Sequence, residues 1–71
     1  MFPLSLGNIG QTYSVMKISG NQETKHFLEN LGFVQDSQVE LIQSLNGNII
    51  VSIKDSRIAI NEGMAKHIYI G

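Results

Sequence analysis

The chain has 71 residues, no cysteine and a formal net charge of −1. This length fits one domain, residues 1–71, and the lack of cysteine excludes disulfides and thiolate metal sites. Five lysines and arginines in all are too few for a phosphate-binding surface, so we expect no nucleic-acid partner. The sequence has no apolar run long enough for a bilayer and no signal-peptide pattern, which predicts a soluble, cytoplasmic protein without membrane insertion.

Residues 11–19 form the first predicted strand. Tyr13 and Val15 alternate with polar residues, and Met16 and Ile18 then change the phase of the alternation. A change of phase within a strand is typical of a β-bulge, which small barrels use to bend and close.

Residues 22–31 form the one predicted α-helix. Asn21 is a candidate N-cap, and Gly32 suits the C′ position, where a left-handed conformation is easy for glycine. Four residues follow helical spacing and are expected to share the inward face: Thr24, Phe27, Leu28 and Leu31.

The rest of the chain is interpreted as four strands joined by turns. Asn46–Gly47 is a strong hairpin signal, and Asp55–Ser56 is a second predicted turn. A single helical turn is expected before the last strand. The strands are placed at residues 38–45, 48–54, 57–61 and 67–70, and the helical turn at residues 62–66.

The register of the Asn46–Gly47 hairpin stays open. A two-residue turn pairs Ile42 with Val51, whereas a three-residue loop with a glycine bulge pairs Leu41 with Ile53. A shift of one residue exchanges the two faces of a strand, so only one register can hold.

These elements predict a mainly β fold. Short antiparallel hairpins lose their exposed edges when the sheet closes on itself. We therefore expect a small SH3-like barrel of about five strands with one inserted α-helix at about residues 22–31.

Catalytic motifs are missing from the sequence. There is no cysteine nucleophile, no Gly-x-Ser-x-Gly elbow and no Walker A loop, and the acidic residues are dispersed. We predict no catalytic residue and no enzyme activity.

His26 and Glu29 are the sharpest candidates for a metal site. Their spacing on a helix builds metal sites when other helices add ligands. One helix supplies too few ligands, so we predict a solvated helix face, no metal site and no cofactor, with Fe²⁺ as the alternative ligand. His67 is interpreted as a histidine at the edge of the last strand.

Arg57 is the only arginine and follows a predicted turn. A single arginine supplied to a partner nucleotidase can stabilise phosphoryl transfer. Ordinary exposed charges also occur beside turns, so this role is kept as an alternative.

A series of apolar and glycine motifs runs through the whole chain. In order they are Leu4-x-Leu6-Gly7, Ile18-x-Gly20, Leu28-x-x-Leu31-Gly32-Phe33, Val39-x-Leu41, Ile53 followed by Ile58-Ala59-Ile60, and Ala65-x-x-Ile68-x-Ile70. The series resembles the FeoA family, small cytoplasmic accessory proteins of bacterial ferrous iron transport. Asp36–Ser37 departs from the Pro–Gly turn that is usual in that family.

The resemblance implies an SH3-like fold and a role beside FeoB, the membrane ferrous iron permease with a cytosolic G-protein domain. FeoA-like proteins are thought to bind FeoB and adjust transport, without catalysis of their own. The same module also occurs at the C-terminus of iron-dependent repressors. Those proteins carry a DNA-binding domain before it, and we expect none within these 71 residues. The matched positions are apolar or glycine, so they explain the fold and identify no contact site.

We therefore expect a non-enzymatic binding module for the cytosolic part of a FeoB-type transporter. The alternatives are an Fe²⁺-responsive regulator and an activator of a partner GTPase. The oligomeric state stays open. The expected contact residues are the outward helix residues Gln22, Lys25, His26 and Glu29, together with Arg57.

Overall fold

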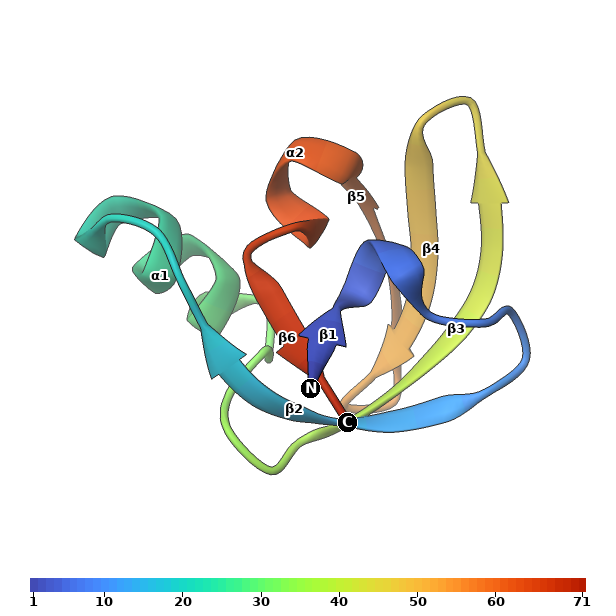
Figure 1. The fold of residues 1–71 in the computed structure, drawn as a ribbon, viewed down its shortest axis with the longest axis horizontal. Coiled ribbons are helices and arrows are strands. Elements are labelled where there is room, and N and C mark those ends of the chain that lie inside the picture. The colour runs from blue at the N-terminus through green and yellow to red at the C-terminus, as the bar shows by residue number, and fades with distance from the viewer.

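The computed structural model describes every residue from Met1 to Gly71. Its strands form one antiparallel arrangement in the order β1-β6-β2-β3-β4-β5 (Figure 1). The elements in chain order are β1 (Phe2–Pro3), the 3₁₀ turn η1 (Leu4–Leu6), β2 (Thr12–Ile18), α1 (Gln22–Asn30), β3 (Gln38–Leu45), β4 (Asn48–Ile53), β5 (Ser56–Asn61), α2 (Glu62–Ala65) and β6 (Ile68–Ile70).

The predicted mainly β fold with one inserted helix is confirmed. The sheet has six strands, one more than the rough expectation, because Phe2 pairs with Ile70 and Pro3 with Tyr69. This pairing brings the two ends of the chain together, while α1 projects from the left side of the barrel in Figure 1. Neither helix is long and apolar enough to cross a membrane.

A single cluster of 13 buried hydrophobic residues fills the barrel. Isoleucine, valine and leucine from the strands supply most of it, since the chain is poor in aromatic residues. The helix contributes Leu28, and the loop after its C-terminal glycine contributes Phe33. Both side chains are fully buried. The inserted helix is thus anchored through its C-terminal end.

Strand β2 contains the predicted bulge. The register with β6 shifts between Val15 and Lys17. The first half of β2 pairs with β3, starting at Thr12, and the second half pairs with β6 up to Ile18. The bulge bends the strand where it passes from one neighbour to the other, which allows the sheet to curl.

The β3–β4 hairpin differs from both predicted registers. Leu45 pairs with Asn48, so the turn has two residues, and Asn46 and Gly47 both have positive φ angles of 52° and 79°. Two positive φ angles are the requirement of a type I′ turn. The two-residue turn is therefore correct, and the glycine-bulge loop is wrong.

The expected pair of Ile42 with Val51 is also wrong. The register shifts between Leu41 and Gln43, and Leu41 lies opposite Val51. The extra residue keeps Leu41 and Val51 together on the buried face. The register is thus determined by two things, the turn and the burial of Leu41 and Val51.

The second predicted turn lies one residue earlier than expected. Its central residues are Lys54 and Asp55, with φ angles of 52° and 64°, and Ser56 already pairs with Ile53 as the first residue of β5. The same correction applies to the turn after α1. The amide of Ser37 donates to the carbonyl of Val34 at 3.0 Å, which makes Gln35–Asp36 the central pair in place of Asp36–Ser37.

Helix α1 begins and ends as the sequence predicts. The side chain of Asn21 accepts a hydrogen bond from the amide of Thr24 at 2.8 Å. At the other end, the amide of Phe33 donates to the carbonyl of Leu28 at 3.0 Å, and Gly32 has a φ angle of 109°. This is a Schellman ending, which only glycine adopts without strain.

The inward face of α1 is narrower than the periodicity suggests. Leu28 is fully buried, but Phe27 is 48% exposed. Thr24 and Leu31 are half-buried. A large aromatic side chain predicted to lie in the core is therefore left at the surface.

Candidate partner-binding surfaces

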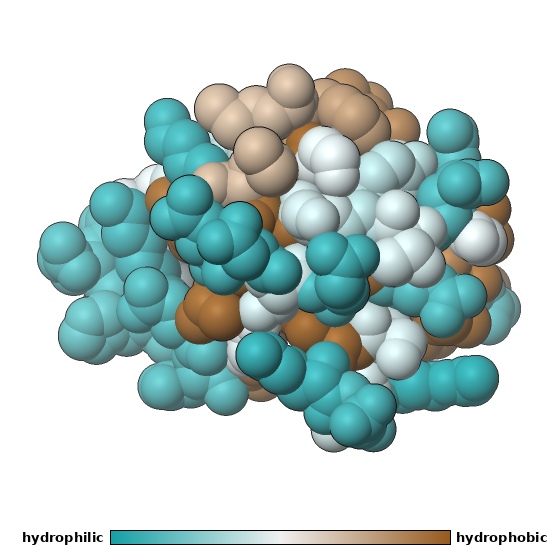
Figure 2. Space-filling model, turned by 90° about the horizontal axis from the view of Figure 1, so that it is seen from below, coloured by the Kyte–Doolittle hydropathy of each residue, from teal (hydrophilic) through white to brown (hydrophobic).

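The outward face of α1 carries four of the five predicted contact residues. Gln22, His26 and Glu29 are exposed, and Lys25 is half-buried. The left end of the molecule in Figure 2, where α1 lies, is almost uniformly hydrophilic. The structure therefore exposes three of these residues and leaves Lys25 half-buried, on a helix that stands out from the barrel.

His26 and Glu29 share one helix without a further metal ligand. The structure brings no three histidine or acidic side chains into one cluster. Structural and catalytic zinc sites in proteins use three or four protein ligands, and these two side chains supply two.

Arg57 lies on a different surface from the four helix residues. It is exposed on β5 and pairs with Ser52 on β4. Because directly paired residues project from the same face of a sheet, Arg57 shares the outer face of the barrel with Ser52. The five predicted residues thus form two groups.

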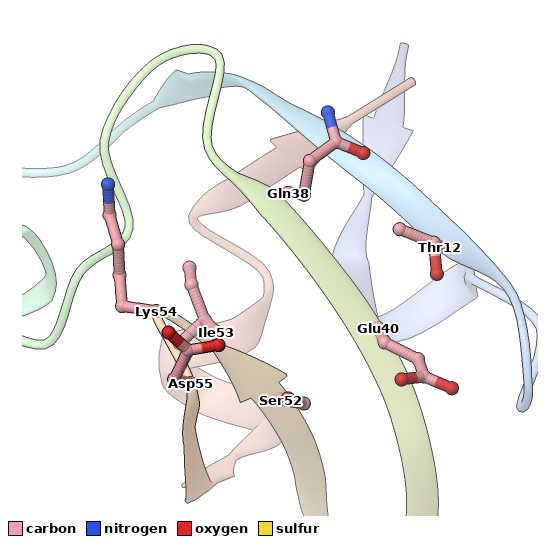
Figure 3. Close-up of a pocket in the computed structure, with 7 residues that line it drawn as sticks. All are labelled: Thr12, Gln38, Glu40, Ser52, Ile53, Lys54 and Asp55. Atoms are coloured by element: carbon pink, nitrogen blue, oxygen red, sulfur yellow. The ribbon is translucent and has the colours of Figure 1, made fainter.

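A polar basin lies on the outer face near Arg57 (Figure 3). Its volume is about 340 Å³, and only one of its lining residues is hydrophobic. The strand pairing builds it, since Glu40 lies opposite both Thr12 and Ser52. The lining residues are Thr12, Gln38, Glu40, Ser52, Ile53, Lys54 and Asp55.

The charged side chains of the polar basin do not converge on one point. In Figure 3 the carboxylates of Glu40 and Asp55 lie on opposite sides of Ser52, and the Lys54 ammonium points away from Asp55. Groups that hold a cation or an anion converge on it. This basin is therefore a solvated polar face, and sequence reasoning had no signal for it because its residues come from three strands and the turn after β4.

An apolar groove lies between α1, β5 and α2. Its volume is about 230 Å³, and six of its seven lining residues are hydrophobic. Phe27 and Leu31 line it from the helix, and Met64 lines it from α2. The remaining lining residues are the β5 residues Ile58, Ala59, Ile60 and Asn61.

The exposed side chain of Phe27 forms part of the wall of this groove. Large hydrophobic side chains gathered around a hollow mark interaction sites on small soluble proteins. The helical spacing of Phe27 and Leu31 was part of the signal, but only the fold brings residues 27–31 beside residues 58–64.

Ser19 and His67 form a polar contact between the end of β2 and the start of β6. The hydroxyl of Ser19 lies 3.1 Å from Nδ1 of His67, and the amide of Ser19 donates to the carbonyl of His67 at 2.8 Å. A Ser–His pair in catalysis is oriented by a third polar group on the histidine. The hydroxyl also lies 3.4 Å from the His67 carbonyl, and these contacts join the end of β2 to the start of β6.

The architecture defines the class of protein as a small SH3-like barrel domain with an inserted helix and an exposed apolar groove. A family model described as the FeoA domain matches residues 2–71. The chain therefore belongs to the FeoA domain family, accessory proteins of ferrous iron transport.

A relative from Methanocaldococcus jannaschii supports this assignment. The two proteins are 33% identical over 70 residues, which cover 99% of this chain and 85% of the relative. The relative carries the provisional name Fe(2+) transport protein A.

Solved structures share the fold over nearly the whole chain. An iron uptake regulatory protein, FeoA, superposes with a TM-score of 0.92 at 27% identity, covering 99% of this chain and 93% of that one. FeoA from Stenotrophomonas maltophilia, described as a prokaryotic SH3 domain protein and solved with zinc, gives 0.86 at 19% identity over 100% and 91% of the two chains.

The same fold also forms part of a larger protein. A manganese-dependent transcriptional repressor matches with a TM-score of 0.88 at 20% identity, over 97% of this chain and 35% of the repressor. This likeness is one of fold alone.

Proposed function

We propose that this chain is a non-enzymatic accessory module of ferrous iron transport that binds the cytosolic part of a FeoB-type membrane GTPase and permease. Residues 1–71 act as one domain in the cytoplasm. The apolar groove between α1, β5 and α2 is the observation that carries this proposal, since it leaves Phe27 at the surface where a partner can cover it.

The contact surface extends from the groove to the charged residues around it. Phe27 and Leu31 lie on α1, so a partner in the groove also reaches the exposed face of the same helix. An apolar centre with a polar rim is the usual anatomy of a protein interface. The proposed rim residues are Gln22, Lys25, His26 and Glu29 on the helix and Arg57 on β5.

Binding of this kind adjusts transport through an equilibrium. A partner that prefers one conformation of the transporter's cytosolic part raises the population of that conformation by the ratio of its affinities. The barrel is suited to this role because its groove is built on elements fixed by the core, so little ordering is required on binding.

A titration against the purified cytosolic domain of a FeoB-type transporter tests the proposal. We expect saturable binding in the micromolar range or tighter, weakened several-fold by combined charge reversal at Lys25 and Glu29 (K25E and E29K). The reversal leaves the net charge unchanged, so a general electrostatic effect is controlled. An absence of binding at high micromolar concentration contradicts the proposal.

A further inference from the structure

Strand β5 has a free edge beside the apolar groove. It is the last strand in the sheet order, so it pairs only with β4. Ser56 pairs with Ile53 directly after a two-residue turn, and hydrogen-bonded pairs then alternate along the ladder. The alternation directs the N–H and C=O groups of Arg57 and Ala59 away from β4.

The two faces of β5 differ in chemistry. Ile58 and Ile60 pair with Val51 and Ile49, which are buried, so these two isoleucines face inward. Arg57 faces outward with its partner in β4. A strand added along the free edge follows the same alternation, because paired residues project from the same face.

The groove continues the inward face beyond β5. Residues of an added strand opposite Ile58 and Ile60 would enter the groove and contact Phe27 and Met64. The groove's 230 Å³ is below the volume of usual small-molecule pockets. It holds one or two apolar side chains, which fits a peptide strand.

Charged residues make the two ends of this free edge chemically different. Arg57 is exposed at one end, after the oppositely charged turn residues Lys54 and Asp55, and Glu62 is exposed directly after the other end. A residue opposite Arg57 in an added strand would project outward beside its guanidinium. A carboxylate there is complementary to that charge.

We propose that β5 binds an extended segment of a partner protein as an added antiparallel strand, and that this segment has, from N- to C-terminus, the pattern apolar–any–apolar–acidic with the acidic residue opposite Arg57. Main-chain hydrogen bonds to Arg57 and Ala59 supply affinity, and the alternate side chains in the groove supply specificity. This deepens the proposed function by naming the chemistry of the partner segment.

Selection from a library of random peptides tests strand addition without the transporter. We expect enriched peptides to share the apolar–any–apolar–acidic pattern. In amide hydrogen exchange, the amides of Arg57 and Ala59 should be exposed in the free protein and protected at least tenfold in the peptide complex. The amides of Ile58 and Ile60 serve as internal controls, because they are already bonded to β4.

Two variants separate main-chain from side-chain recognition. Ala59→Pro removes one N–H from the free edge, where proline is tolerated, and should weaken peptide binding at least tenfold. Gln35→Pro, which places a proline in the exposed turn after α1, is the control and should bind like the wild type. Arg57→Glu should shift the selected peptides from an acidic to a basic residue at the last position of the pattern.

The outcomes distinguish this inference from the proposed function. Peptides that bind Ala59→Pro as tightly as Gln35→Pro, or that leave the Arg57 and Ala59 amides unprotected, overturn strand addition even if the transporter domain binds. Failure to enrich any peptide, or protection that comes from self-association of the free protein, also overturns it. Peptide binding at β5 without transporter binding refutes the transporter as partner and leaves strand addition standing.

Discussion

The side chain of Asn61 accepts a hydrogen bond from the amide of Met64 at 2.8 Å. This bond caps the first turn of α2 and fixes the position of Met64 at the apolar groove. Asn21 makes the equivalent bond to Thr24 at the start of α1, which carries Phe27 to the other side of the groove. Both helical walls of the groove thus begin with a capping asparagine.

Asn61→Ala should lower the free energy of unfolding by about 1 kcal/mol, because an orphan amide of α2 loses its acceptor. For a domain of this size that corresponds to a fall in melting temperature of roughly 4–8 °C. Asn61→Asp, which retains a capping oxygen, is the matched control and should stay close to the wild type. Thermal unfolding followed by circular dichroism gives the comparison, and equal melting temperatures for Asn61→Ala and the wild type would refute the role of the cap.

The turn after α1 offers a stabilising change. Asp36 has a φ angle of 73° at the third position of the turn from Val34 to Ser37, where a type II turn prefers glycine after proline. Gln35→Pro combined with Asp36→Gly should raise the free energy of unfolding by about 1 kcal/mol, since proline restricts the unfolded chain and glycine removes strain. Urea unfolding at equilibrium measures this change.

Asp36→Pro is the opposing control for the turn. It removes the hydrogen bond from the Asp36 amide to the Val15 carbonyl, 2.8 Å long, and imposes a negative φ angle. It should destabilise the domain. A stabilising effect of this variant would show that the turn has a different conformation in solution.

The sequence predicted those elements whose signals are local. The N-cap at Asn21, the glycine ending at Gly32 and the bulge in β2 each depend on a few adjacent residues. The position of the β3–β4 bulge was not predictable in this way. It depends on which residues of two strands are buried together, and Leu41 and Val51 are ten positions apart.

The groove was beyond sequence reasoning for the same physical reason. Helical spacing groups Phe27 with Leu28, but a short helix packed on a small barrel buries only part of its apolar stripe. Which part stays exposed depends on the position of β5 and α2, which lie some thirty residues later in the chain. Arg57 was identified from its turn, whereas its neighbours on the free edge of β5 were not.

A substitution of Arg57 distinguishes binding to a partner GTPase from stimulation of its GTP turnover. We expect Arg57→Ala to weaken binding to the transporter's cytosolic domain by about two- to fivefold, the range of a surface charge contact. GTP turnover at saturating concentrations of this protein should then be the same for variant and wild type. A fall in turnover of 10³-fold or more at saturation would instead identify Arg57 as a residue that acts on the phosphoryl group.

Partner binding should not depend on metal held by α1. His26→Ala removes the one imidazole on the helix and should leave Fe²⁺ titrations by anaerobic calorimetry unchanged, because His26 and Glu29 have no third ligand nearby. A chelator should likewise leave the affinity for the transporter domain unchanged. An Fe²⁺ binding signal that disappears in His26→Ala would support the alternative, an iron-responsive regulator.

The most direct measurement of the central claim compares two exposed hydrophobic residues on different surfaces. Phe27, 48% exposed, lines the groove, and Leu45, 52% exposed, lies at the end of β3 outside it. Phe27→Ser and Leu45→Ser should each change stability little, and each is titrated calorimetrically against the cytosolic domain of the FeoB-type transporter. Phe27→Ser should lose at least tenfold in affinity, as expected for an aromatic residue at the centre of an interface, while Leu45→Ser binds like the wild type. Equal affinities for the two variants would contradict the assignment of the groove as the partner-binding site.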